Sequence, residues 1–122
     1  MYVTISEEDK IALFDVDPDS GRLESTGEAQ VTGRPAPLAI NPDRSRLYVG
    51  RRDIKEISTF EVDQNSGDLS MVGTVPLESD PCYISTDKTG KYLLSAYYSA
   101  GRAAVHSIDD SGTAVAPPVE WR

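Results

Sequence analysis

Apolar residues occur along this chain in short runs that alternate with polar positions and are separated by turn-forming residues. Val, Ile, Thr, Tyr and Phe fill the runs, whereas Gly, Pro, Asn and Asp interrupt them, which is typical of β-strands joined by tight turns. In residues 56–63 the two faces alternate: Ser58, Phe60 and Val62 on one face, and Ile57, Thr59 and Glu61 on the other. No window shows a sustained apolar pattern with the period of a helix, about 3.6 residues. We therefore predict an all-β protein with almost no helix.

Two motifs repeat along the chain. Phe-Asp-Val-Asp, followed by Ser-Gly and Leu, occupies residues 14–23, and it returns 46 residues later as Phe-Glu-Val-Asp, Ser-Gly and Leu. A looser third copy begins at His106. Between these copies, Pro-Leu-Ala-Ile-Asn-Pro-Asp at 37–43 matches residues 81–87 at an offset of 44, and the following segment from Arg46 matches at an offset of 45. A period in the mid-forties is the length of a β-propeller blade of four strands.

The repeats predict eleven strands, which form one partial β-propeller of about 2.75 blades of four antiparallel strands. Residues 1–31 read as an incomplete blade that lacks its first strand, 32–77 as a complete blade and 78–122 as a third blade. Because propellers close a ring of about four to eight blades, we expect the chain to be part of a longer protein. The predicted strands are 1–5, 11–17, 23–31, 37–41, 46–50, 56–63, 68–75, 81–85, 91–97, 102–109 and 115–121.

The segment 37–43, followed by Arg-Leu-Tyr-Val-Gly at 46–50 and by Arg52, resembles the second blade of the seven-bladed lactonase propellers. This is the family of bacterial 6-phosphogluconolactonase and fungal 3-carboxy-cis,cis-muconate cyclase. Residues 60–69 are similar to the same family's third strand and turn, and 80–101 to the opening of its next blade. The resemblance covers nearly the whole chain in the correct order, and it implies the N-terminal third of a protein of roughly 315 residues.

The resemblance also implies an activity for the whole protein, namely hydrolysis of a sugar-acid lactone such as 6-phosphogluconolactone. Within the same family, lactonisation of a carboxymuconate is an alternative. The family's His, Arg and Glu positions proposed to act on the lactone mostly lie in later blades, so we assign no catalytic residue within this chain. A non-catalytic propeller that binds a small molecule or a protein remains a second alternative, and an inactive gene fragment a third.

Two kinds of connection alternate between the predicted strands. Those between first and second, and between third and fourth, strands of a blade are short and repetitive, whereas the others are longer and more varied. Varied loops on a rigid scaffold usually carry function, so we expect the binding face there. The varied connections are residues 6–10, 32–36, 51–55, 77–80 and 97–102.

Arg52 is our first candidate for binding the anionic lactone, because it matches the family's Arg after Tyr-Val-Gly and because a guanidinium forms bidentate bonds to carboxylate or phosphate. Arg51 and Tyr97 are the other candidate substrate-binding residues, and Tyr98 is a weaker one. The alternative for Tyr97 is packing between blades. For the arginines of this face, which include Arg34 and Arg102, and for Lys55, the alternative is solubilising charge paired with acidic neighbours: Asp53, Glu56 or Glu78.

His106, the only histidine, has a pKa suited to a general base, but it takes the place of Phe14 and Phe60 in the repeat, so we expect it to be packed between blades. Cys82, the only cysteine, takes the place of Leu38, and we expect a small buried side chain rather than a nucleophile. One His and one Cys cannot supply the usual ligands of zinc, and the Asp-rich turns lack the spacing of a calcium loop. We predict no metal and no cofactor.

Charge and hydropathy narrow the range of partners. The chain has 12 Lys and Arg against 20 Asp and Glu, a net charge of −8, which argues against nucleic acid or an anionic membrane as partner. Its apolar runs are too short for a transmembrane helix. We expect a cytoplasmic protein whose partners are an anionic small-molecule lactone and either the remaining blades or, in self-association, a second copy.

Overall fold

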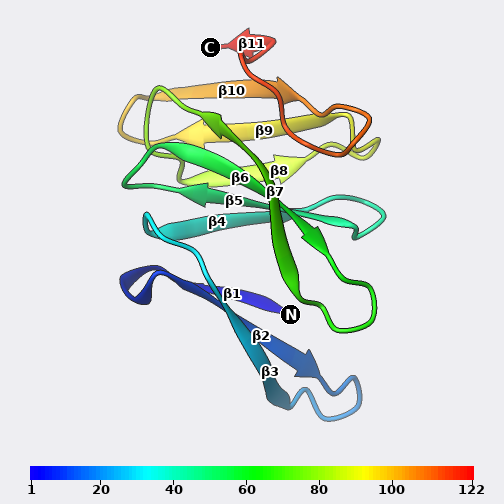
Figure 1. The fold of residues 1–122 in the computed structure, drawn as a ribbon. Coiled ribbons are helices and arrows are strands. Elements are labelled where there is room, and N and C mark those ends of the chain that lie inside the picture. Colours follow the sequence, from blue (N-terminus) through cyan, green and yellow to red (C-terminus); the bar gives the residue numbers. More distant parts are fainter.

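The computed structural model describes residues 1–122 and consists almost entirely of antiparallel strands (Figure 1). The prediction of an all-β fold made of propeller blades is confirmed, and the only helical element is one turn of 3₁₀ helix, η1 (Ser6–Glu8). No helix in the structure has the length and apolar character needed to cross a lipid bilayer. The first sheet contains β1 (Tyr2–Ile5), β2 (Lys10–Val16) and β3 (Leu23–Gln30), in that order.

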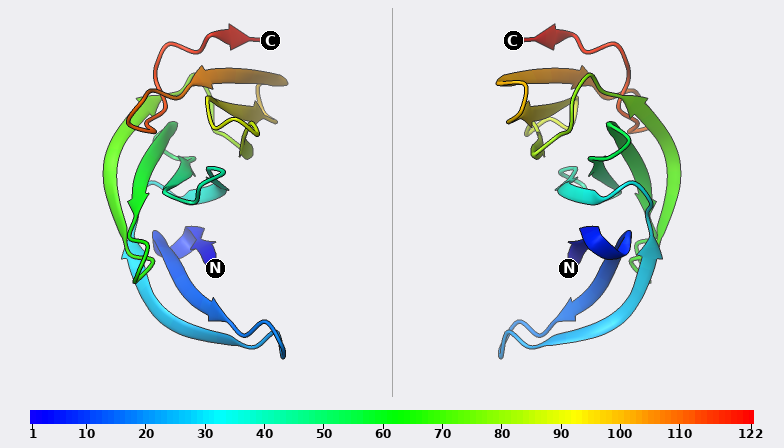
Figure 2. Two further views of the ribbon diagram at one scale, coloured as in Figure 1. Left: turned by 90° about the vertical axis from the view of Figure 1, so that its right-hand side faces the viewer. Right: turned by 90° about the vertical axis from the view of Figure 1, so that its left-hand side faces the viewer.

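The second and third sheets have four strands each, hydrogen-bonded in chain order from the first strand of the blade to the fourth. The three sheets stack one after another, and β4 contacts both β1 and β8. Figure 2 shows the resulting arc, with β3 and β7 along its convex side. The strands of the second sheet are β4 (Pro35–Ile40), β5 (Arg46–Arg51), β6 (Glu56–Val62) and β7 (Leu69–Pro76), and those of the third are β8 (Tyr83–Thr86), β9 (Tyr92–Tyr97), β10 (Arg102–Ser107) and β11 (Glu120–Trp121).

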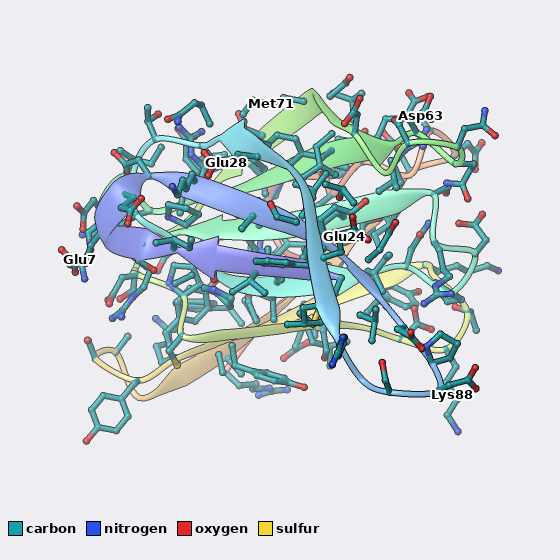
Figure 3. All side chains as sticks on the ribbon, turned by 90° about the horizontal axis from the view of Figure 1, so that it is seen from below. Glu7, Glu24, Glu28, Asp63, Met71 and Lys88 are labelled. Carbon is teal, nitrogen blue, oxygen red and sulfur yellow. The ribbon has the colours of Figure 1, made fainter.

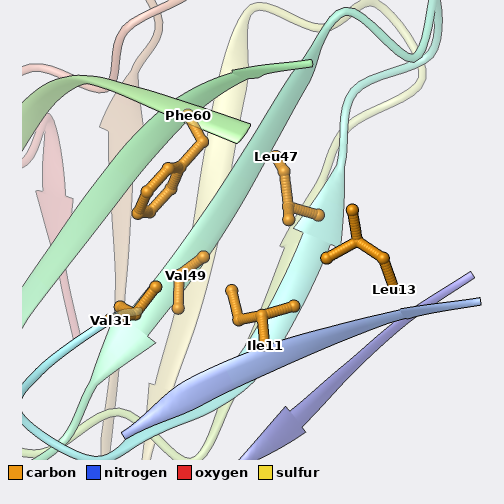
Figure 4. Close-up of a cluster of buried hydrophobic side chains, with 6 residues drawn as sticks. All are labelled: Ile11, Leu13, Val31, Leu47, Val49 and Phe60. Atoms are coloured by element: carbon orange, nitrogen blue, oxygen red, sulfur yellow. The ribbon is translucent and has the colours of Figure 1, made fainter. Parts of the chain in front are cut away.

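Each interface between neighbouring sheets has its own apolar core. Because successive strand residues point to opposite faces, Leu47 and Val49 of β5 face the first sheet whereas Tyr48 faces the third, and the second sheet is buried on both sides. Figure 4 shows the first core, which contains Ile11, Leu13, Val31, Leu47, Val49 and Phe60. The second core contains Tyr48, Ile57, Val75, Ile84, Leu93 and Ala114.

The turns at one end of the sheets share one construction. Asp63 Oδ1 accepts hydrogen bonds from the backbone N–H groups of Asn65 and Ser66, and Gly67 closes the turn at a φ of 77°, a conformation that glycine adopts without steric cost. These hydrogen bonds lower the pKa of Asp63. Figure 3 shows Asp63 and Lys88 at this end of the molecule and Glu7, in a varied loop, at the other.

Tyrosine hydroxyls connect each blade to a turn of the next. The hydroxyl of Tyr2 on β1 donates to the Gly67 carbonyl, and the hydroxyl of Tyr48 on β5 donates to the Gly112 carbonyl, both at 2.6 Å. Leu94 holds the corresponding position on β9, because it pairs with Val105 as Tyr48 pairs with Thr59. The same tyrosine–carbonyl hydrogen bond therefore connects the first sheet to the second and the second to the third, whereas the third sheet has no tyrosine at this position.

Strand pairing corrects the sequence alignment of the first strands. Leu38 pairs with Val49, and Ile84 pairs with Ser95, so the offset between these strands is 46 rather than 44. Cys82 therefore does not take the place of Leu38. Its side chain is exposed, with its Sγ 3.3 Å from the Ala96 carbonyl, and the expectation that it is buried was wrong.

The last strand is much shorter than the predicted segment 115–121, since β11 contains only two residues. Val115 and Val119 still donate backbone hydrogen bonds to β10, at the carbonyls of Ser107 and Val105. Between them, Pro117 and Pro118 have no N–H group to donate, and this interrupts the ladder.

Candidate functional site

The loops at the Glu7 end of the sheets carry several cationic side chains, and most of them form ion pairs within the chain. Lys10 pairs with Glu8 and Glu28, and Arg34 with Glu7 and Asp53. Exposed pairs of this kind contribute little to stability, since water screens them. The three pairs nearest the predicted site are Arg51–Glu56 at 3.3 Å, Arg52–Asp80 at 2.6 Å and Arg102–Glu78 at 3.8 Å.

Arg51, at the end of β5, lies in the interface between the first and second sheets and is only 9% exposed. Its Nε donates to the Thr32 carbonyl at 2.7 Å and its Nη2 to Thr32 Oγ1 at 2.9 Å. Its Nη1 contacts Glu56 and the buried Ser58 hydroxyl at 3.3 and 3.2 Å. The guanidinium is thus occupied in joining the β3–β4 connection to β6, which leaves little donor capacity for a ligand.

Arg52 follows Arg51 directly but lies in a different environment. Its side chain is 40% exposed, and only Nη2 makes a side-chain hydrogen bond, to Asp80 Oδ2 in the β7–β8 connection. This bond lowers the pKa of Asp80. The Nε of Arg52 is buried without a hydrogen-bond partner. One carboxylate therefore holds the guanidinium in place, and its exposed part, which does not include Nε, keeps donor capacity for a ligand.

Tyr97 lies in the third sheet, where it pairs with Arg102 of β10, whereas Arg51 and Arg52 extend from the second sheet. It ends β9, in the position of the third sheet that Arg51 holds in the second, and is 1% exposed. Its hydroxyl shares a hydrogen bond of 2.7 Å with Ser95, and its ring packs edge-on against Trp121 at a centroid distance of 5.0 Å. Burial raises the pKa of Tyr97. The neighbouring Tyr98 is 89% exposed.

His106 is packed between the second and third sheets, as the repeat predicted, and is 1% exposed. Its Nδ1 lies 3.1 Å from the Val115 carbonyl; since a carbonyl can only accept, Nδ1 carries the proton. Burial lowers the pKa of His106, and the hydrogen bond to Val115 opposes this only in part. The imidazole is therefore neutral and nearly fully buried, and its one proton is bound to a carbonyl, so we do not assign it as the general base that activates water.

Buried His106 should make stability depend on pH. Its folded-state pKa lies below the unfolded value of 6.5, so below about pH 6.5 the unfolded chain binds more protons, and stability falls as the pH decreases. The slope cannot exceed about 1.4 kcal/mol per pH unit, the limit for the binding of one proton. His106→Phe, which introduces the residue found at Phe14 and Phe60, should lose this slope. Urea unfolding of both proteins between about pH 7 and pH 5 tests this, and equal slopes would contradict it.

Sequence reasoning missed two residues that shape this end of the molecule. Asp80 was not among the acidic partners expected for Arg52, because a connection between blades has no fixed register that predicts its contacts. Trp121 was expected only as part of a strand, yet it packs on Tyr97 and lies 4.2 Å from the Arg102 guanidinium in a cation–π contact. No group of three or more His, Cys, Asp or Glu side chains is arranged as metal ligands.

Comparison with known proteins places this fold in a family. The model of the lactonase family, described as "Lactonase, 7-bladed beta-propeller", matches residues 1–120. The 6-phosphogluconolactonase of Serratia proteamaculans is 38% identical over 117 residues, which are 96% of this chain and 35% of that protein. The 6-phosphogluconolactonase of Xenorhabdus nematophila is 41% identical over 97 residues, 80% of this chain and 29% of that protein.

Solved structures of similar proteins have the same fold. The crystal structure of a putative 6-phosphogluconolactonase from Bacteroides fragilis superposes with a TM-score of 0.85 at 21% identity, over 98% of this chain and 34% of that chain. The chain thus spans about a third of the length of the curated relatives it matches. From its repeats, its strand order and these matches, the chain belongs to the family of seven-bladed β-propeller lactonases.

Proposed function

We propose that this chain is part of an enzyme that opens the ring of a sugar-acid lactone, with 6-phosphogluconolactone as the substrate. The relatives of similar sequence carry that name. The observation in the chain itself that supports the proposal is Arg52, a half-exposed guanidinium at the varied-loop end that makes a single side-chain hydrogen bond. A phosphate or carboxylate on the substrate needs such a donor.

Each candidate residue has a separate task in this proposal. Arg52 contacts the anionic group of the lactone, and Asp80 holds its guanidinium in place. Arg51 is a positioning residue, because its bonds to Thr32 fix the end of the strand from which Arg52 extends. Tyr97 packs against Trp121 and supports the neighbouring loop, rather than contacting the lactone.

Hydrolysis also needs a base that activates water and donors that stabilise the oxyanion. His106 is buried with Nδ1 bound to a carbonyl, and Arg51 is occupied by its neighbours. We therefore assign the base and the oxyanion donors to other blades of the ring, in line with the absence of any catalytic assignment from the sequence.

A chimera tests this function. Residues 1–122 replace the corresponding third of the Serratia proteamaculans enzyme, and disappearance of 6-phosphogluconolactone is measured above its spontaneous hydrolysis. We expect turnover by the chimera. Arg52→Gln should raise KM for the lactone by about tenfold to a hundredfold, which is the loss of one charge-assisted hydrogen bond. Unfolding and circular dichroism confirm that each protein is folded.

Arg34→Gln is the matched control, because Arg34 is a 46%-exposed arginine at the same end whose guanidinium pairs with Glu7. It should leave KM within about twofold of the parent. A folded chimera without turnover would overturn the proposed activity. An active chimera whose KM does not change on Arg52→Gln substitution would overturn only the role of Arg52.

We also propose that the protein is cytoplasmic. Its one cysteine, Cys82, is exposed and unpaired, which suits a compartment that keeps thiols reduced. The remaining partner in the proposal is structural, namely further blades of the ring or a second copy of the chain that covers the exposed face of the third sheet.

A further inference from the structure

A cavity of about 480 Å³ lies between the second and third sheets and extends along β10 from the varied-loop end toward the Asp-rich turns, and Arg52 is not among its lining residues. It is bounded by the end of β7, by Tyr97 at the end of β9, by His106 nearer the opposite end of the third sheet, and by the segment that leads into β11. Most of its wall is formed by proline and aromatic side chains. The lining residues are Pro76, Leu77, Glu78, Tyr97, His106, Ala116, Pro117, Pro118 and Trp121.

The corresponding place in the first interface is filled by side chains. There the ring of Phe60 belongs to the apolar core, and the guanidinium of Arg51 forms hydrogen bonds to the β3–β4 connection. In the third sheet the corresponding residues are His106 and Tyr97, by the same register offset of 46. Two positions of this repeated interface thus carry different side chains at the place where the cavity lies.

Two buried polar atoms of the residues that line this cavity have no hydrogen-bond partner, His106 Nε2 and Trp121 Nε1. Since Nδ1 of His106 carries the proton that binds Val115, its Nε2 is an acceptor. Indole Nε1–H is a donor only. Leaving buried polar atoms unpaired is costly, and a hydroxyl group, which both donates and accepts, suits an acceptor and a donor alike.

The other residues of the cavity wall limit the shape and charge of a ligand that fits. Flat proline and aromatic surfaces suit an aromatic ring. At the rim, the 73%-exposed carboxylate of Glu78 pairs with Arg102, so no unpaired charge there favours an ionic ligand. We propose that this cavity binds a small neutral aromatic alcohol, whose hydroxyl pairs with His106 and Trp121. This ligand differs in charge and in place from the anionic lactone of the proposed function.

The site stays accessible when more blades are present. His106 and Leu93 face the second sheet, whereas Tyr83 and Leu94 lie on the opposite face of the third sheet, where a following blade would pack. A blade added there does not cover the cavity, so the site belongs to the pair of blades in this chain.

The proposal is tested with 4-fluorophenol as the probe and 4-fluorotoluene as the same ring without a hydroxyl. Fluorine NMR measures binding of each to the 122-residue chain, and the fluorescence of Trp121, the only tryptophan, locates it. We expect saturable binding of 4-fluorophenol with a change in indole fluorescence, and an affinity about tenfold above that of 4-fluorotoluene. If the hydroxyl found no partner in the cavity, 4-fluorotoluene would bind more tightly than 4-fluorophenol, because burying an unpaired hydroxyl is costly.

His106→Phe removes the acceptor and should weaken 4-fluorophenol binding by about tenfold or more, whereas Tyr92→Phe, on the opposite face of the third sheet, should not change it. If the His106 variant does not fold, the affinities of the two probes for the unaltered chain still test whether the cavity prefers a ligand with a hydroxyl group. Equal or tighter binding of 4-fluorotoluene, absence of saturable 4-fluorophenol binding, or unchanged indole fluorescence would overturn the proposal.

Discussion

Replacing Arg51 with methionine is expected to lower the free energy of unfolding by about 3 kcal/mol. The side chain is nearly buried, and its guanidinium bonds to Thr32, Glu56 and Ser58. Methionine retains most of the apolar stem but none of the donors. The Thr32 carbonyl and the fully buried Ser58 hydroxyl then lose their partners, and the cost of leaving such groups unpaired dominates the effect.

Arg52→Met is the matched control, since it makes the same substitution one residue later at a side chain that is 40% exposed. It should cost less than about 1 kcal/mol, because water replaces the exposed ion pair with Asp80. Urea unfolding followed by circular dichroism gives both values. A loss of less than about 1 kcal/mol for Arg51→Met would show that its hydrogen bonds do not stabilise the interface.

The 122-residue chain by itself is expected to associate in solution through the exposed face of its third sheet. Tyr83 and Leu94 lie on this face and are 63% and 41% exposed. The corresponding face of the second sheet, which includes Tyr48 and Ile57, is buried under the third sheet. Because this face is buried against a neighbouring sheet in one blade, we expect the equivalent exposed face of the next blade to be covered by another sheet.

The double change Tyr83→Lys and Leu94→Lys should weaken this association by about a hundredfold or more, because it removes two apolar side chains from the contact and adds charge. Light scattering coupled to size-exclusion chromatography measures the mass. Met71→Lys is the control, since Met71 is 48% exposed on β7, the outer strand of the second sheet, and should leave the mass unchanged. A compact monomer of the unaltered chain at all concentrations would contradict the expectation.

The two adjacent arginines, Arg51 and Arg52, show which features of the site could be predicted from the sequence and which could not. Both end a strand at the varied-loop end, and both were candidates to bind the substrate. Their roles differ because Arg51 meets Thr32 of the preceding blade connection whereas Arg52 meets Asp80 of the following one. These partners are 19 and 28 residues away along the chain, and nothing in the local pattern of residues specifies which of them each arginine reaches.

The first strand of each blade shows a related limit. The turn motifs align at an offset of 44, yet the strands pair at an offset of 46, since Asp43 is the third residue after β4 whereas Asp87 is the first residue after β8. The alignment therefore placed Cys82 in a buried position that the fold gives to another residue. Similarly, Pro117 and Pro118 shortened the last strand because pairing depends on backbone N–H groups, which hydrophobic alternation does not report.

The all-β class, the repeat, the eleven strands and the family were all predictable from the order of residues, because alternation and turn residues act locally and recur in every blade. The tertiary structure alone decided which side chains meet between blades: the Tyr–Gly contacts, the bonds of Arg51, the Arg52–Asp80 pair and the cavity beside His106. Those contacts depend on how one sheet stacks on the next, and the stacking is set by packing between residues that are far apart in the chain.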